Sequence, residues 1–226
     1  MTARFAIERD LVLMGGGGHG RVLAQAIELL GGWIIAVNDP RLLAEGSSGM
    51  GPPILSDHEV LARCPPDRVL LVNGVGSTGP AEARHDLARR WRERGYRFAT
   101  IVHPGALVAA DAALGEGVQV MAGAVVQTAA RIGADGVVNT RASVDHDCVL
   151  EETVHLAPGV TLSGGVAVGA LSHLGTGAVA IQGVRIGRRC LVGAGAVVVG
   201  DLDDDSRVAP GVVAGARPAA KEAGRS

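Results

Sequence analysis

The chain has very few aromatic residues: Phe, Trp and Tyr make up 2% of its 226 residues, although hydrophobic residues make up 47%. This composition favours a narrow interior of Val, Ile, Leu and Ala over a core filled by large rings. Three cysteines are too few for a disulfide framework. The net charge of −2 gives no sign of a basic surface, so we predict no nucleic-acid partner.

Long apolar runs are also missing. No stretch approaches the roughly 18 consecutive apolar residues of a membrane span, and the N-terminal sequence MTARFAIERDLVLM lacks the apolar segment of a signal peptide. We therefore expect a cytoplasmic protein that does not insert into a membrane. A chain of this length fits one or two domains.

The second half of the chain carries a repeat with a period of six. An aliphatic residue recurs at every sixth position from Val108 to Val198, and fifteen of these sixteen residues are Val, Ile or Leu. A period of six fits neither an α-helix nor an ordinary β-strand. It predicts a parallel β-solenoid, in which each short strand is followed by a turn and three sides make one coil. The aliphatic residues then line the interior.

Small or slim residues stand two positions before the aliphatic ones, where the corners of the coil are crowded. Cys148 and Cys190 are two of them, and they lie more than two coils apart. They are thus too distant to form a disulfide, and buried packing is their expected role. The alternative of a cysteine nucleophile stays open at this point.

The first 100 residues follow a different pattern. Apolar runs at 11–14, 33–37 and 69–72 predict buried strands, and helical spacing separates them. Ser56 and Glu59 predict a capping box, residues 77–80 a helix start, and residues 41–53 a loop. We predict a Rossmann-like α/β half domain at residues 1–102 and an all-β solenoid domain with a C-terminal cap at residues 103–226.

A glycine motif joins the first strand to the first helix. Gly15-x-Gly17-x-x-Gly20 matches the GxGxxG fingerprint, and Asp39 stands nineteen residues later. Such a loop lets a diphosphate approach backbone N–H groups at a helix N-terminus. The half domain has room for a mononucleotide, so a nucleotide-linked sugar is the preferred ligand. NAD binding and a tight turn without ligand are the alternatives.

Histidines are the other candidates for a catalytic or ligand-binding role. His19 lies in the glycine loop, where a ligand phosphate would lie. His146, His155 and His173 interrupt the solenoid, and by phase they point away from its core. His155 and His173 are eighteen residues apart and should stack about 5 Å apart on successive coils. Because no clear third ligand is present, we predict no metal site.

Together these stretches resemble a known family. The segments LMGGGGHGRV, Val37-Asn38-Asp39, Ile101-Val102-His103-Pro104, and Asn139-Thr140 through Val149 are similar to the bacterial sugar O-acyltransferases and nucleotide-amino-sugar N-acetyltransferases, which include the sialic acid O-acetyltransferases. The resemblance covers nearly the whole chain. It implies a left-handed β-helix of hexapeptide repeats, a homotrimer with active sites between subunits, and acetyl-CoA as co-substrate.

The resemblance also implies roles for particular residues. His146 corresponds to the general base and Asp147 to the acid that supports it. His155 and the positions Gly164, Gly175, Thr176 and Ala194 correspond to the acetyl-CoA site. For the sugar substrate we predict contacts from the following residues: Gly17, Gly18, His19, Asp39, Pro40, Gly74 and Asn139. The family's C-terminal Gly-x-Pro-Ala signature is present only as Gly215-Ala216-Arg217-Pro218-Ala219, with one extra residue.

We therefore expect an acetyltransferase of polysaccharide biosynthesis that acts by direct attack of a sugar amine on acetyl-CoA. O-acetylation of sialic acid or another sugar hydroxyl is the enzymatic alternative. A non-catalytic solenoid that binds a nucleotide-linked sugar is the alternative from another class. His146 and His155 fall on different sides of the coil, so one subunit would hardly bring them together, whereas a neighbouring subunit could.

Overall fold

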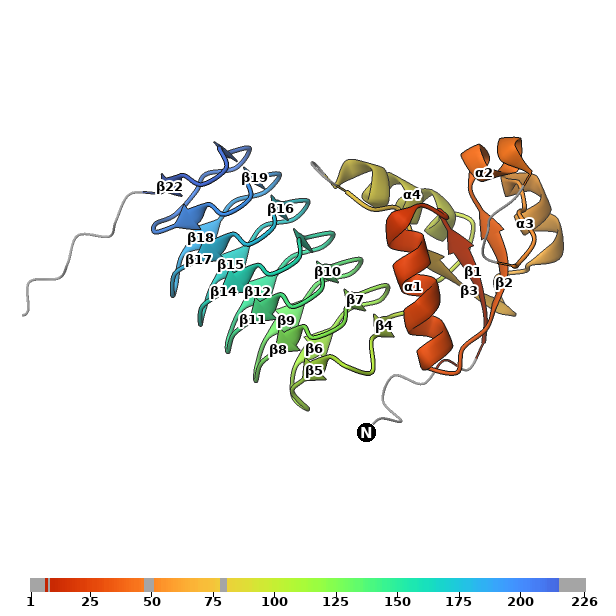
Figure 1. Cartoon of the computed structure of the whole chain (residues 1–226), viewed down its shortest axis with the longest axis horizontal. Helices are drawn as coiled ribbons and strands as arrows, with labels where there is room; N and C mark the ends of the chain where they lie inside the picture. The colour runs from red at the N-terminus through yellow and green to blue at the C-terminus, as the bar shows by residue number, and fades with distance from the viewer. Residues whose placement is uncertain (1–6, 8, 47–50, 78–80, 216–226) are drawn as a thin grey trace, which may run out of the picture.

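The computed structural model of the chain describes residues 7, 9–46, 51–77 and 81–215, and it contains an α/β part followed by a long parallel solenoid (Figure 1). In the α/β part a parallel sheet has the order β2-β1-β3. Its elements are β1 (Asp10–Met14), α1 (Gly18–Leu29), β2 (Ile34–Asn38), α2 (Pro40–Glu45), α3 (Asp57–Arg63), β3 (Val69–Asn73) and α4 (Glu82–Arg92). None of the helices in this described part has the length and hydropathy of a membrane span.

The three strands of this sheet end at the same edge, because they are parallel. The amide of Gly15 donates to the carbonyl of Asn38, and the amide of Gly74 donates to the carbonyl of Met14. The loops after β1, β2 and β3 therefore meet at one place, which is where open α/β sheets bind ligands.

The α/β elements follow the sequence prediction with one exception. The three strands and the capping box of Ser56 and Glu59 are confirmed. The loop predicted at 41–53 is wrong at its start, because α2 occupies residues 40–45. Asp39 caps this helix and Pro40 occupies its first turn, a favourable start that the Gly, Ser and Pro residues further along obscured. Residues 78–80, part of the predicted helix start, lie outside the described residues.

The solenoid consists of two-residue strands stacked into three parallel sheets, named here by their first strands. The β4 sheet contains β4 (Ile101–Val102), β7 (Gln119–Val120), β10 (Val137–Val138), β13 (His155–Leu156), β16 (His173–Leu174), β19 (Leu191–Val192) and β21 (Arg207–Val208). The β5 sheet contains β5 (Leu107–Val108), β8 (Val125–Val126), β11 (Ser143–Val144), β14 (Thr161–Leu162), β17 (Val179–Ala180), β20 (Val197–Val198) and β22 (Val213–Ala214). The β6 sheet contains β6 (Ala113–Leu114), β9 (Arg131–Ile132), β12 (Val149–Leu150), β15 (Ala167–Val168) and β18 (Arg185–Ile186).

The interior of the solenoid is aliphatic, as the period of six predicts. The second residue of each strand points inward, and from Val120 to Val198 all of these residues are buried. The small corner residues are buried with them, including Cys148 and Cys190, whose thiols are free. Each strand pairs with the strand one coil later, as His155 does with His173.

The solenoid extends further than the sequence prediction. The cap predicted after Val198 is wrong for residues 199–215, which form another coil with β21 and β22. Arg207 pairs with Leu191 and Val213 with Val197, sixteen positions apart instead of eighteen. A corner shortened by two residues breaks the sequence period, while the backbone pairing continues across it.

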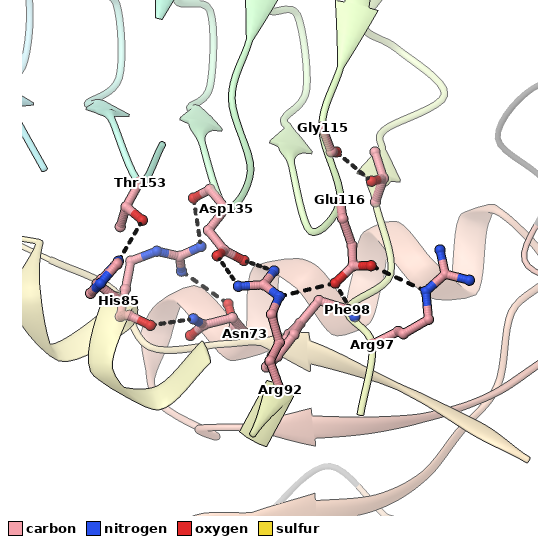
Figure 2. A network of polar contacts seen from close by, with 11 residues as sticks. Asn73, His85, Arg92, Arg97, Phe98, Gly115, Glu116, Asp135 and Thr153 are labelled. Atoms are coloured by element: carbon pink, nitrogen blue, oxygen red, sulfur yellow. Dashed lines mark hydrogen bonds and ion pairs between the residues drawn. The ribbon is translucent and has the colours of Figure 1, made fainter. Parts of the chain in front are cut away.

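Helix α4 fastens the α/β part to the corners of the solenoid (Figure 2). The guanidinium of Arg92 donates to both carboxylate oxygens of Asp135, at 2.6 and 3.0 Å, and to Glu116 at 3.1 Å. Glu116 also accepts from Arg97 and from the amide of Phe98. These contacts fix the position of the α/β part along the solenoid.

Replacing the buried carboxylate of this junction should destabilise the protein. Asp135 is 3% exposed and has φ of +58°, a conformation that Asn adopts readily. Asp135→Asn removes the charge but keeps the turn, and should lower the free energy of unfolding by about 1–3 kcal/mol. Asp205→Asn is the matched control. Asp205 also has a positive φ, of +61°, and also pairs with an Arg, but its side chain is 58% exposed. Urea unfolding should show a clear shift for Asp135→Asn and almost none for the control; equal shifts would contradict this account.

Candidate active site

The glycine loop leaves the N-terminus of α1 open. A Cβ at Gly20 or at Gly74 would lie 2.2 Å from the carbonyl oxygen of Gly15, so the close approach of these loops requires glycine at both positions. A Cβ at Gly18 would meet nothing within 4 Å. Gly17 caps the helix without a side-chain hydrogen bond. The first amides of this twelve-residue helix therefore face a hollow that suits an anion.

Asp39 shapes this loop from the end of β2. Its carboxylate accepts from the amides of Gly16 at 3.0 Å and Arg41 at 2.9 Å, and it pairs with the Arg41 guanidinium at 3.2 Å. Burial acts to raise the pKa of Asp39, but these hydrogen bonds outweigh it and hold the pKa below its ordinary value. In this structure the carboxylate thus supports the glycine loop, in addition to lining the hollow beside it.

That hollow has a volume of about 800 Å³ and is called the nucleotide pocket here, after the ligand that the sequence predicts for it. It contains six of the seven residues predicted to contact the sugar substrate, namely Gly17, Gly18, His19, Asp39, Pro40 and Gly74. Arg41, Ser56, Asp57 and Arg90 add polar groups to its wall. Asn139, the seventh predicted residue, lies elsewhere.

A second hollow, the solenoid groove, runs along the β4 sheet with a volume of about 610 Å³. Four of the five residues predicted to bind acetyl-CoA line it, namely His155, Gly175, Thr176 and Ala194, and Asn139 lies beside them. His19 and Gly76 line both hollows. The nucleotide pocket and the solenoid groove therefore meet at these two residues.

His155 and His173 face the α/β part across the groove. Their ring centroids are 4.8 Å apart, as the stacking prediction requires, and Ser77 Oγ lies 2.7 Å from Nδ1 of His155 and 3.3 Å from Nδ1 of His173. Both point away from the solenoid core, but the α/β part covers them. Burial lowers the pKa of both rings, that of His155 well below the ordinary value, so both are neutral at pH 7.

His146 has a different environment. It follows β11 at an outer corner, with its side chain 48% exposed, and its Nδ1 lies 2.8 Å from Oδ2 of Asp147. The hydrogen bond to Asp147 raises the pKa of His146 above the ordinary value. Gly164 lies under the imidazole, where a Cβ would be 2.5 Å from Nε2. Gly164 therefore belongs to the surroundings of His146 and not to the solenoid groove.

A single chain does not bring His146 to the two hollows. His146 and Asp147 line neither the nucleotide pocket nor the solenoid groove. They follow the β5 sheet, whereas the groove lies on the β4 sheet. Within the described residues, no group of three or more His, Cys, Asp and Glu side chains is arranged to hold a metal ion.

Sequence reasoning missed the residues that join the two hollows. Gln119 is fully buried, and its side chain bonds to His19, which lines both hollows, and to the carbonyl of Asn73. Ser77 and Gly76 lie on the loop after β3, and Arg84 binds the carbonyls of Asn73 and Val75. One signal was present: Gln119, His155 and His173 occupy the same outward position of the coil, His155 two coils after Gln119 and His173 one coil after His155.

No protein-family model matches the chain, and no curated protein matches it. Solved structures do. The acetyltransferase domain of PglB from Neisseria gonorrhoeae, in complex with acetyl coenzyme A, is 35% identical and has a TM-score of 0.82, over 90% of this chain and 97% of that one. PerB from Caulobacter crescentus, in complex with CoA and GDP-perosamine, is 36% identical with a TM-score of 0.80, over 90% and 95%. WeeI from Acinetobacter baumannii, at 23% identity and a TM-score of 0.72, shares the fold.

The raised pKa of His146 gives a first test of this corner. Asp147→Asn should lower the pKa of His146 towards 6.5, because the largest cause of the shift is the hydrogen bond to the Asp147 carboxylate. Asp145→Asn is the control, since Asp145 raises the pKa of the ring through its charge alone, without a hydrogen bond to the imidazole, and its replacement should lower the pKa less. NMR titration of the imidazole measures both, and a larger effect from Asp145→Asn would contradict the assignment.

Proposed function

The chain belongs to the family of β-helix acetyltransferases that modify sugars, and from this premise we propose that it transfers the acetyl group of acetyl-CoA to the amino group of a nucleotide-linked amino sugar. The observation that carries the proposal is the meeting of the nucleotide pocket and the solenoid groove at His19 and Gly76. Two substrates that react with each other need adjoining sites of this kind. PerB, the relative at 36% identity, holds CoA and GDP-perosamine together.

The nucleotide pocket suits the diphosphate and base of the sugar substrate. Its glycine loop presents the open N-terminus of α1, and Gly17 and Gly18 leave room for phosphate oxygens. The solenoid groove suits acetyl-CoA, because its neutral histidines and its small and aliphatic residues line a partly apolar hollow of about 610 Å³. PglB supports this assignment, since its acetyltransferase domain binds acetyl coenzyme A.

His146 is the general base of this mechanism. The sugar amine attacks the thioester carbonyl, a C–N bond forms, and His146 takes a proton from the nitrogen. The C–S bond then breaks, and the thiolate of CoA receives the proton from the imidazolium. Asp147, 2.8 Å from Nδ1, orients the ring and stabilises its charged form. No covalent acyl-enzyme is required.

A second copy of the chain must supply His146, because His146 lines neither hollow of its own chain. We propose a homotrimer with its active sites between subunits. Support comes from the outward positions of the β5 sheet, which are mostly apolar: Leu107 and Val213 are each 65% exposed, and Ile181 on the same face is 36% exposed. The β6 sheet is less apolar, because Arg131 and Arg185 occupy two of its five equivalent positions, with Ala113, Val149 and Ala167 at the others. An exposed apolar face of this kind is typical of a subunit interface.

The proposal is tested by measuring the release of CoA with a panel of UDP-, GDP- and dTDP-linked 4-amino sugars and sialic acid. Release with one amino sugar, with acetylation of its nitrogen in the product, is the expected result. Release only with a hydroxyl acceptor would move the enzyme to O-acetylation. No release with any acceptor would support the non-catalytic alternative and overturn the proposal.

Removing the base should lower turnover strongly. General-base catalysis contributes about 10²–10⁴-fold, so His146→Ala should lower kcat by roughly that factor and leave the fold intact. Cys148→Ala is the control, because Cys148 is buried two residues away and takes no part in the chemistry. Its kcat should remain within about twofold. Steady-state kinetics decide, and a loss of less than tenfold for His146→Ala would contradict its role.

Mixed trimers test whether the site is shared. His146→Ala removes the base, and Gly18→Glu places a carboxylate in the open space of the nucleotide pocket. Each variant should be inactive alone. In trimers assembled from both in equal amounts, about a quarter of the sites combine an intact pocket with an intact His146 from the neighbour. Recovery of activity on co-expression is expected, and its absence in confirmed mixed trimers would contradict a shared site.

A further inference from the structure

His19 is held in one orientation at the point where the nucleotide pocket and the solenoid groove meet. Its Nε2 lies 2.7 Å from Oε1 of Gln119. The ring centroid of His155 is 6.5 Å away. No other side chain in the described part of the chain forms a hydrogen bond with the His19 ring.

The hydrogen bonds of Gln119 determine which nitrogen of His19 carries a proton. Nε2 of Gln119 donates to the carbonyl oxygen of Asn73 at 2.8 Å, so the amide nitrogen faces Asn73 and the amide oxygen faces His19. An amide oxygen only accepts, hence Nε2 of His19 must be the donor. Gln119 is fully buried. Turning its side-chain amide over would place its oxygen against the carbonyl oxygen of Asn73 with no hydrogen-bond donor between them, which is unfavourable in a buried position.

The ring is also uncharged. Burial and the nearby cation of Arg84 lower the pKa of His19 to about 4, although the bond to Gln119 acts in the opposite direction. With its single proton on Nε2, the neutral ring has a lone pair on Nδ1.

We propose that His19 is fixed as the neutral Nε2–H tautomer and presents Nδ1 as a hydrogen-bond acceptor to an amine or hydroxyl group of the acceptor sugar. This inference rests on the proposed function and deepens it. Nδ1 of the neutral ring carries no proton, so it cannot donate a hydrogen bond to a phosphate oxygen. The imidazole therefore does not fill the phosphate-binding role that its place in the glycine loop predicts. The amides of the loop bind the diphosphate instead, and His19 orients the sugar at the entrance to the solenoid groove.

The tautomer is tested by ¹⁵N NMR of the histidine side chains, which does not depend on turnover. His19 should show a protonated Nε2, a bare Nδ1 and no titration between pH 6 and 8. Gln119→Glu places a carboxylate against Nε2 and should make the ring an imidazolium near pH 7. Gln127→Glu is the control, because it makes the same charge change at an exposed glutamine of the solenoid. A proton on Nδ1 in the unaltered chain would overturn the inference.

The ligand contact is tested by the Nδ1 signal on addition of ligands. GDP-perosamine or a UDP-linked 4-amino sugar should shift the signal, whereas GDP or UDP alone should not. A full shift with the diphosphates alone would mean a phosphate contact and overturn the proposal. Comparing each amino sugar with its N-acetylated or deoxygenated analogue distinguishes the amine from a hydroxyl as the donor.

Steady-state kinetics of His19 variants provide the last test. His19→Phe should raise KM for the sugar about tenfold, the effect of one lost hydrogen bond, and leave KM for acetyl-CoA within about twofold. His19→Asn, whose amide can place an acceptor near the Nδ1 position, should recover part of the loss. Equal effects of both variants on both substrates would indicate a merely structural role. If no panel sugar reacts, the proposed function fails while the tautomer result stands independently.

Discussion

The hydrogen-bonded contact between the end of β3 and the β4 sheet, called the seam here, is the constraint on which the rest of the site depends. The carbonyl of Asn73, at the end of β3, accepts from both Gln119 and Arg84, and the Asn73 side chain donates to the carbonyl of Arg84. The loop that follows, from Gly74 to Ser77, is the wall between the nucleotide pocket and the solenoid groove. Because the end of β3 is fixed from both sides, the two hollows keep a constant relation to each other.

The seam also removes the equivalence of the three solenoid faces. A regular repeat makes three similar walls, and the outward residues decide what each wall does. On the β4 sheet, Ile101, Gln119 and His155 are buried under the α/β part. The β5 sheet presents exposed Leu107 and Val213, and the β6 sheet combines arginines with Ala and Val. The three faces therefore differ in their outward residues: one is buried against the α/β part, one is mostly aliphatic, and one is mixed.

Much of the fold could be predicted from the sequence because inward positions allow few residue types. The period of six follows from the crowded interior, and the strands and the Ser56 capping box follow from local rules. Helix α2 and the last coil were missed for local reasons: turn-forming residues obscured the first, and a shortened corner hid the second. Pairing in a parallel sheet depends on backbone groups, so it tolerates a change of period that sequence analysis does not detect.

The candidate site was less accessible from the sequence. Sequence patterns and resemblance identified residues that lie together in each hollow, such as Gly17 with Asp39 and His155 with Thr176. They did not identify the bond between His19 and Gln119, one hundred residues apart, since it depends on how the two parts of the chain dock. Gly164 lies beside His146 and not with the other four residues predicted to bind acetyl-CoA, because its hexad position does not reveal which corner it occupies.

The shortened last corner has a consequence for how a solenoid of this kind can change in length. The last coil still pairs strand by strand with the coil before it, although the corner between them is two residues shorter. At that corner the carboxylates of Asp201 and Asp204 accept from the backbone amides of Arg185 and Arg188. Side chains thus provide acceptors for backbone donors where the corner is short. Insertions and deletions are therefore easier to accommodate at the corners of the coil than within its strands.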